Sequence, residues 1–204
     1  MSLPSSDLTL FTVGHSTHPL EYFLELLRSH GIQALADVRS SPFSRFNPQY
    51  NRDNLKRTLK HAEIYYVELG RELGARRAES ECYVGNKVSY PLVVRTPLFQ
   101  QGLERLRHGA AQMRVAIMCA EKDPLECHRT VLVAHYARSI FSHIDHIRED
   151  GNLETQASAD RRLLAAYGVN DTDFFRPRAD LLEEAYRRRG EEIAFEETHE
   201  KAAG

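Results

Sequence analysis

The chain has 204 residues, 42% of them hydrophobic and 27% charged, and its formal net charge at pH 7 is −2. This length and composition are typical of a globular protein with one domain, or one domain and an extension, and with enough apolar residues for a core. The charge disfavours a protein coated by nucleic acid or bound to an acidic membrane surface, and no apolar run approaches the roughly 20 residues that span a bilayer. Three unevenly spaced cysteines are not a secreted disulfide framework, and the N-terminus lacks a signal-peptide pattern, so we expect a cytoplasmic protein without a membrane partner.

Short apolar runs alternate with amphipathic segments over most of the chain. We predict strands at residues 8–13, 32–38, 64–69, 114–119 and 143–148. We predict helices between them, at about residues 19–30, 51–61, 97–112 and 126–140. Residues 70–90 break the pattern with glycines and arginines, and are predicted to form a loop of the kind that acts as a lid or a binding loop.

This alternation predicts an α/β fold, with a mostly parallel five-stranded sheet and helices on both faces. We assign residues 8–151 to this domain. Residues 152–204 are more charged and are interpreted as a C-terminal helical extension with a frayed tail. Within the extension, we predict helices at residues 157–167 and 179–189 and a turn at residues 168–173.

Polar clusters follow three of the predicted strands. Gly14-His15-Ser16 follows the first strand, Asp37-Val38-Arg39 closes the second, and Cys119 ends the fourth shortly before Cys127-His128-Arg129. The carboxyl ends of parallel strands lie at one edge of a sheet, where α/β proteins bind ligands. We therefore expect the three clusters to converge.

The two clustered cysteines allow three chemistries. Cys127, on the first turn of a predicted helix, could be a nucleophilic thiolate. Cys119, Cys127, His128 and His15 could instead be metal ligands. A redox pair is the least favoured, because the offset of eight residues does not resemble a Cys-x-x-Cys element. Cys82 lies alone in the loop and is predicted to be incidental.

Proton transfer would fall to the histidines and the acids of these clusters. His15 or His128 would move a proton, and Asp37 or Glu121 would orient the imidazole. Structural roles are also open: His15 could cap the following helix, and Asp37 could pair with Arg39, which lies on the same side of an extended strand.

Several residues at the strand ends suit the binding of an anion. Backbone N–H groups at a helix start and guanidinium groups both attract phosphate. The candidates are Gly14, Ser16, Arg39, Arg45 and Arg129. Residues 39–60 contain six basic residues and one acidic residue, interleaved with Phe43, Phe46 and Tyr50, a pattern that suits phosphates or unpaired bases. For Lys56, Arg57 and Lys60 we prefer a solvated helix face.

Over residues 8–151 the chain resembles the domain of unknown function 488 family. The motifs that carry the resemblance are Thr12-Val13-Gly14-His15-Ser16, Asp37-Val38-Arg39-Ser40-Ser41-Pro42-Phe43-Ser44-Arg45-Phe46-Asn47-Pro48, Cys119-Ala-Glu121 with Cys127-His128-Arg129, and His143-Ile-Asp-His-Ile-Arg148 with Asp150-Gly151. The resemblance implies an α/β domain with a shared functional site, and it implies no particular reaction. A weaker resemblance, to rhodanese-like and phosphatase-like domains, lacks their compact Cys-x5-Arg loop.

The leading hypothesis is an enzyme that binds a small anionic substrate, such as a nucleotide or another phosphorylated metabolite, at the carboxyl edge of the sheet. One alternative is a nucleic-acid-associated binding module without catalysis, which would use residues 39–60 and the loop at 70–90. A metal-binding or purely structural Cys–His site is a further alternative.

Overall fold

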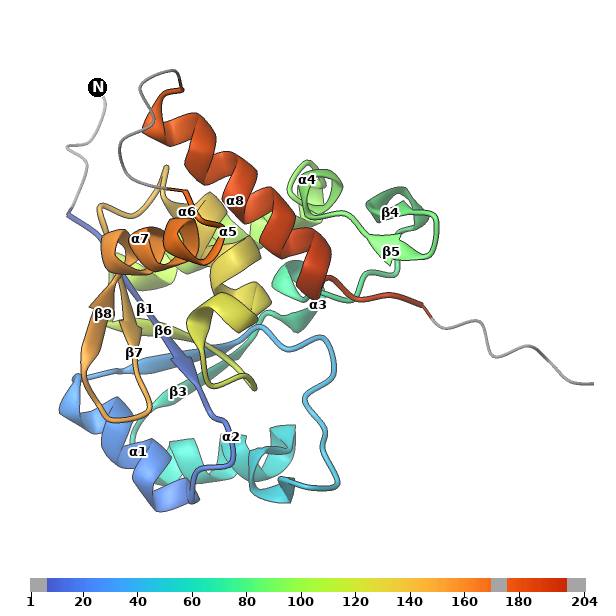
Figure 1. Ribbon diagram of the computed structural model, residues 1–204. Helices are drawn as coiled ribbons and strands as arrows, with labels where there is room; N and C mark the ends of the chain where they lie inside the picture. The colour runs from blue at the N-terminus through green and yellow to red at the C-terminus, as the bar shows by residue number, and fades with distance from the viewer. Residues whose placement is uncertain (1–6, 170–175, 198–204) are drawn as a thin grey trace, which may run out of the picture.

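The computed structural model describes residues 7–169 and 176–197 and shows an α/β fold (Figure 1). The main sheet contains all five predicted strands in parallel: β1 (Thr9–Gly14), β2 (Ala34–Asp37), β3 (Tyr65–Glu68), β6 (Val115–Cys119) and β7 (His143–Ile147). Across the sheet the strands follow the order β3-β2-β6-β1-β7-β8, which a single sequence does not reveal.

A sixth strand, which the sequence pattern does not predict, lies at one edge of the sheet. It is β8 (Leu153–Thr155), which pairs antiparallel with β7. Its three residues are exposed or half-buried, so the strand has no apolar run that would predict it.

The register of the central strands brings the predicted polar clusters to one edge. Gly14 at the end of β1 pairs with Cys119 at the end of β6. Asp37 at the end of β2 pairs with Met118, one residue before Cys119. The three strand ends are therefore level with one another, and the segments that follow them meet at the carboxyl edge of the sheet.

Helices cover both faces of the sheet, as predicted (Figure 1). One face packs against α1 (Leu20–Ser29) and α2 (Arg52–His61), which supply buried leucines and a phenylalanine to the core. The other face packs against α5 (Pro97–Ala110), α6 (His135–Ala137), α7 (Gln156–Ala166) and α8 (Arg178–Ile193). Both faces are thus filled by apolar side chains, and the carboxyl edge is left for polar groups.

The C-terminal helices pack closely on the α/β fold. Leu163 of α7 and Leu181 of α8 belong to the same apolar cluster as Leu10 of β1. The boundary between residues 151 and 152 stays a prediction. The predicted turn lies partly, and the predicted frayed tail largely, outside the described residues.

Residues 70–90 differ from the predicted loop, because they contain several short elements. These are α3 (Gly70–Leu73), a 3-10 turn at Ser80–Cys82, β4 (Tyr83–Val84) and β5 (Lys87–Val88), followed by α4 (Tyr90–Val93). The buried side chain of Arg77 holds the segment together by donating to the carbonyl oxygens of Arg71 and Glu72 and to the carboxylate of Glu79. Side-chain hydrogen bonds of this kind leave no periodic signal in the sequence.

The predicted helix at residues 126–140 is irregular. A 3-10 turn at Pro124–Glu126 precedes it, Cys127 is extended, and the next residues form a π-helical segment, Arg129–Ala134, that continues into α6. π-Helical turns are frequent at functional sites. Among the described residues no helix is long and apolar enough to cross a membrane.

Candidate functional site

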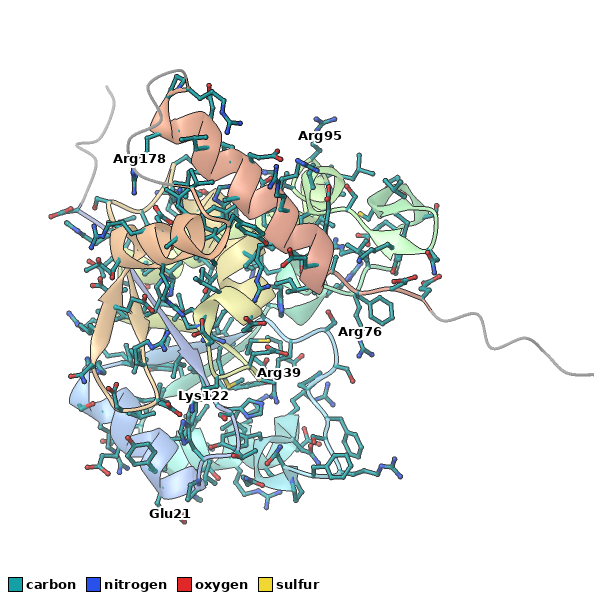
Figure 2. All side chains as sticks on the ribbon, in the orientation of Figure 1. Glu21, Arg39, Arg76, Arg95, Lys122 and Arg178 are labelled. Atoms are coloured by element: carbon teal, nitrogen blue, oxygen red, sulfur yellow. The ribbon has the colours of Figure 1, made fainter. Side chains whose placement is uncertain are left out.

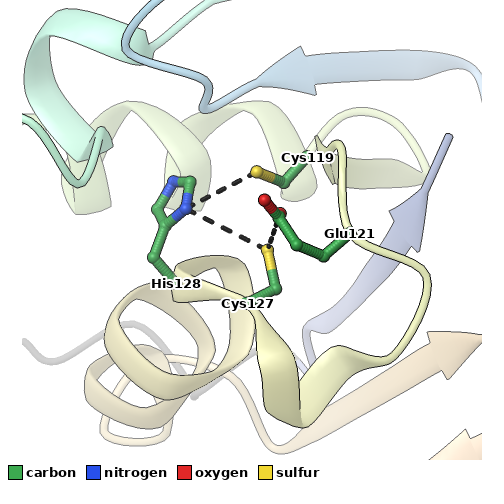
Figure 3. Close-up of side chains that lie close together, drawn as sticks. All are labelled: Cys119, Glu121, Cys127 and His128. Atoms are coloured by element: carbon green, nitrogen blue, oxygen red, sulfur yellow. Dashed lines mark hydrogen bonds between the residues drawn. The ribbon is translucent and has the colours of Figure 1, made fainter. Parts of the chain in front are cut away.

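Four side chains from the third polar cluster converge at the carboxyl end of β6 (Figure 3). The Sγ atom of Cys119 lies 3.5 Å from Nδ1 of His128, and the Sγ atom of Cys127 lies 4.0 Å from the same nitrogen. The Sγ atom of Cys127 also lies 2.9 Å from Oε2 of Glu121. The four groups face one another from both ends of the loop that links β6 to the π-helical segment.

The loop that carries these residues is fixed by the chain around it. The buried guanidinium of Arg129 donates to the carbonyl oxygens of Glu121, at 2.5 Å, and Lys122, at 3.1 Å. Gly14 allows the loop to approach β1, because a Cβ atom at that position would lie 2.0 Å from the carbonyl oxygen of Glu121. Gly14 therefore admits a close approach of this loop, and its contact with a substrate stays a prediction.

Cys127 occupies the start of the helical segment. Its carbonyl oxygen accepts hydrogen bonds from the backbone N–H groups of Thr130 and Val131. Its sulfur accepts the backbone N–H of Arg129 at 3.5 Å. The thiol thus lies where unpaired N–H groups and the helix dipole stabilise negative charge.

The imidazole of His128 is oriented by the neighbouring strand end. Its Nε2 atom donates to the carbonyl oxygen of Val38 at 3.0 Å, which directs Nδ1 toward the two sulfurs. A histidine that binds a metal is usually held in this way, with the second ring nitrogen bonded to a backbone carbonyl or a carboxylate.

The two thiols differ in acidity because their surroundings differ. Burial raises the pKa of Cys119, and the neighbouring Cys127 raises it further. Burial also opposes ionisation of Cys127, but the hydrogen bond from Cys119 and the positive charges of Arg129 and His128 hold the pKa of Cys127 well below its usual value. Burial and the negative charge of Cys127 raise the pKa of the Glu121 carboxyl. The surroundings thus favour ionisation of Cys127 over ionisation of Cys119.

A cavity of about 310 Å³ opens beside the cluster and makes three of its side chains accessible, those of Cys119, Glu121 and His128. Its remaining walls come from four segments. They are Arg39, Ser40 and Ser41 after β2; Ala75, Arg76 and Tyr90; Ala120 and Glu126; and Ile193 and Phe195 at the end of the described chain.

The donor set fits a zinc ion. Nitrogen and sulfur ligands on a tetrahedral zinc ion lie about 3.5 Å apart, given Zn–N of about 2.0 Å and Zn–S of about 2.3 Å. The observed separations from His128 Nδ1 are 3.5 Å to Cys119 and 4.0 Å to Cys127. All four potential ligand atoms, including a carboxylate oxygen of Glu121, lie within 4.8 Å of one another.

The other predicted catalytic residues form a separate buried network. Asp37 and Arg39 are paired at 2.6 Å, and Nη1 of Arg39 donates to Nε2 of His15 at 3.2 Å. Nδ1 of His15 donates to the carbonyl oxygen of Ser16 at 2.8 Å, and the imidazole stacks on the ring of Tyr50. His15 and Asp37 do not line the 310 Å³ cavity, so the structure brings Cys119, Glu121, Cys127 and His128 together and leaves His15 and Asp37 apart from them.

The predicted anion-binding residues are dispersed. Arg39 lines the cavity, but its guanidinium is engaged by Asp37, Tyr50 and His15. Arg129 is buried under the loop, and Arg45 is exposed on a loop outside the cavity. The roles predicted for these residues and for Ser16 stay predictions.

Two cavity residues were missed by sequence reasoning. Arg76 lies beside Arg39 (Figure 2), and its guanidinium stacks over the ring of Phe195. Tyr90 is buried, and its hydroxyl has no hydrogen-bond partner among the residues that the structure describes. Both lie within the irregular segment 70–90, and neither belongs to a strand-end motif that could have singled it out.

The fold and the cluster define an α/β protein with a Cys-Glu-Cys-His site at the carboxyl edge of a mostly parallel sheet. The chain belongs to the family described as "Domain of unknown function DUF488", whose model matches residues 19–136 and includes the whole cluster. No curated protein and no solved structure matches the chain.

Proposed function

We propose that the chain is a zinc-dependent enzyme that acts on a small anionic substrate at the carboxyl edge of the sheet. The observation that carries the proposal is the convergence of two thiols, an imidazole and a carboxylate, with ligand atoms within 4.8 Å of one another, beside a cavity. Two sulfur ligands and one nitrogen ligand suit zinc, whereas magnesium and calcium prefer oxygen ligands.

Three of the four groups are suited to be permanent ligands. Cys119, Cys127 and His128 are buried and are held by β6, by the start of the helical segment and by the carbonyl oxygen of Val38. Catalytic zinc sites combine three protein ligands with an open position for water or substrate. A Cys2His site of this kind would leave that position toward the cavity.

Glu121 is suited to act as a base next to the open position. Its side chain is exposed and lines the cavity, while one carboxylate oxygen lies 2.9 Å from the sulfur of Cys127. Zinc lowers the pKa of a bound water, and a nearby carboxylate can accept the proton as that water attacks a substrate. The reaction class favoured by this arrangement is metal-assisted hydrolysis.

The cavity supports a small anionic substrate. Its volume of about 310 Å³ is at the lower end of the range for small-molecule sites. Arg76 is exposed on its wall and forms no ion pair among the described residues, and Ser40 and Ser41 add hydroxyl groups. A phosphate or carboxylate group could bind Arg76 while the reacting bond faces the cluster.

The test is the metal content of the purified protein and of matched variants, measured by plasma mass spectrometry. We expect about one zinc ion per chain in the wild type and a loss of zinc in Cys119→Ser, Cys127→Ser and His128→Asn. Cys82→Ser is the control, since Cys82 is also a buried free cysteine but lies outside the cluster. Glu121→Gln should keep the metal and lose hydrolysis of a panel of phosphate and carboxylate esters.

Two results would contradict the proposal. Wild-type protein that neither contains zinc nor binds added zinc would exclude the metal, and selective alkylation of Cys127 would then indicate metal-free thiol chemistry. A loss of zinc in Glu121→Gln as complete as in Cys119→Ser would make Glu121 a fourth ligand and the site a closed, structural one.

A further inference from the structure

We infer that the exposed loop at residues 42–47 is a stacking platform for single-stranded nucleic acid, and that one nucleotide of this strand is the small anionic group that reacts in the cavity. The second half of the inference rests on the function proposed above, whereas the first half does not. The platform consists of Phe43, Arg45 and Phe46.

The platform presents two aromatic rings to solvent. The side chains of Phe43 and Phe46 are 68% and 88% exposed, whereas Phe11, Phe23 and Phe99 are at most 3% exposed. Phenylalanine is usually buried, and exposed aromatic residues that lie together mark binding surfaces. Two exposed phenylalanines separated by only Ser44 and Arg45 therefore favour a binding surface.

The rings project from a loop with a fixed shape. The backbone N–H of Ser44 donates to Oδ1 of Asn51 at 2.7 Å, and Oγ of Ser44 accepts the backbone N–H groups of Phe46 and Asn47. The loop is closed by the backbone N–H of Arg52, which donates to the carbonyl oxygen of Pro42 at 3.0 Å. A loop fixed in this way loses little conformational entropy when a ligand binds to it.

The platform and the helix that follows it both carry exposed cations, which favour a polyanion. Arg45 lies between the two phenylalanines in sequence and is exposed, and Lys56, Arg57 and Lys60 are on α2, which begins just after the loop. None of these four cations forms an ion pair among the described residues, whereas Arg52 pairs with Asp53 and Glu68. Aromatic faces for bases and unpaired cations for phosphates are the two components of a single-strand binding surface.

The platform follows the cavity wall closely along the chain. Ser40 and Ser41 line the cavity wall, and Phe43 follows two residues later, a distance of about 7 Å along an extended chain. Arg76 on the same wall could bind the next phosphate of a strand whose bases stack on the platform. This geometry directs one nucleotide of the strand toward the Cys119–Glu121–Cys127–His128 cluster.

The binding test uses a fluorescein-labelled single-stranded DNA of about 12 nucleotides, and an RNA of the same sequence, followed by fluorescence anisotropy. Phe43→Ala and Phe46→Ala should each weaken binding by about 5-fold to 100-fold, the effect of losing one stacked base. Arg45→Ala should weaken binding to all sequences and lower the slope of affinity against salt by about one phosphate contact. A duplex of the same sequence should compete poorly, because its bases are not free to stack.

Matched controls lie elsewhere on the surface. Leu153→Ala removes an exposed apolar side chain from the edge strand β8, and Arg95→Ala removes an exposed cation distant from Arg39 and Arg76 in Figure 2. Both variants should bind like the wild type. Equal affinity of the wild type and the two phenylalanine variants would overturn the platform and would point to a protein partner for this surface.

The two halves of the inference fail in different ways. Metal-free wild type should still bind the strand, since the platform contains no metal ligand. Platform-dependent binding without turnover of the strand by the zinc-loaded protein would overturn the assignment of the substrate. Zinc binding without any affinity for oligonucleotides would overturn this inference while the proposed function stood.

Discussion

Two polar clusters lie at the same edge of the sheet, and they differ in how completely their hydrogen bonds are satisfied. The carboxylate of Asp37 accepts four hydrogen bonds: from the backbone N–H, Nε and Nη2 of Arg39, and from the hydroxyl of Tyr66. In the cluster of Cys119, Cys127 and His128, the partners of the imidazole Nδ1 within the described part of the chain are the two sulfurs. The Asp37 carboxylate in the first cluster is fully engaged, whereas in the second cluster two thiols and an imidazole face one another and can exchange protons for a metal ion.

This difference assigns separate tasks to the two clusters. The network of Asp37, Arg39 and His15 ties the ends of β1 and β2 to the loop that reaches Tyr50, so it fixes the wall of the cavity. The sulfur cluster lies beside that wall and, in the proposed function, would provide the reactive groups. Buried charge alone therefore does not identify a functional site, because buried ion pairs can also serve to hold strands and loops in place.

The comparison is tested most strongly by neutralising one carboxylate in each cluster. Asp37→Asn leaves the buried Arg39 guanidinium without its counter-charge and should lower the free energy of unfolding by about 3–5 kcal/mol. Glu121→Gln neutralises a carboxylate that lines the cavity and has no cationic partner among the described residues, and it should change that free energy by no more than about 1 kcal/mol. Denaturant titrations of the metal-free variants measure both values. Equal losses would mean that the two clusters have the same structural role.

The structure also shows which features a sequence can predict. The central strands β1, β2 and β6 are predictable because they are almost entirely buried and read as apolar runs, whereas β7, which is only partly buried, is predictable from its alternating pattern. β8 was missed because its three residues lack such a run, and the elements within residues 70–90 were missed because the side chain of Arg77 holds them in place. Periodicity reports burial, and it does not report hydrogen bonds made by side chains.

The site was predicted in its location but only partly in its membership. Strand ends at one edge of a parallel sheet must meet, so the proximity of Cys119 to Cys127 and His128 follows from the topology. The sequence could not show that Arg39 would be engaged by Asp37, since a free and a paired guanidinium look alike in a sequence. Tyr90 enters the site only because α8 packs against it, a contact between distant segments.

The free energy of unfolding should fall as the pH is lowered, because buried histidines become protonated on unfolding. Burial and the positive charge of Arg39 lower the pKa of His15 from 6.5 to about 4. The unfolded chain therefore binds a proton that the folded chain excludes, and the stabilisation is fully present above about pH 6.5 and is lost as the pH falls toward about 4. His135 and His146, whose pKa values burial lowers to about 3, act in the same direction.

This contribution can be isolated by substitution. Between about pH 6.5 and 5, His15 should account for on the order of 2 kcal/mol of the fall in the free energy of unfolding. Denaturant titrations at both pH values should therefore show a smaller fall for His15→Gln than for the wild type. The same fall in both proteins would show that His15 is protonated in the folded state and that its network is less closed than the geometry indicates.

The smallest change in the free energy of unfolding is expected from a substitution at Tyr90. The hydroxyl of Tyr90 is buried without a partner, and Gly190 of α8 fixes the ring, since a Cβ atom there would lie 2.9 Å from Cδ2 of Tyr90. Removing an unsatisfied polar group should raise stability, so Tyr90→Phe should gain about 1 kcal/mol in the free energy of unfolding. Tyr66→Phe is the matched control: it removes a hydroxyl that donates to Asp37 at 2.8 Å and should lose about 1–3 kcal/mol. If Tyr90→Phe gains stability and Tyr66→Phe loses it, the Tyr90 hydroxyl destabilises the fold, as expected for a group beside the cavity that binds a ligand. If both variants lose stability, the Tyr90 hydroxyl already has a hydrogen-bond partner in the folded chain.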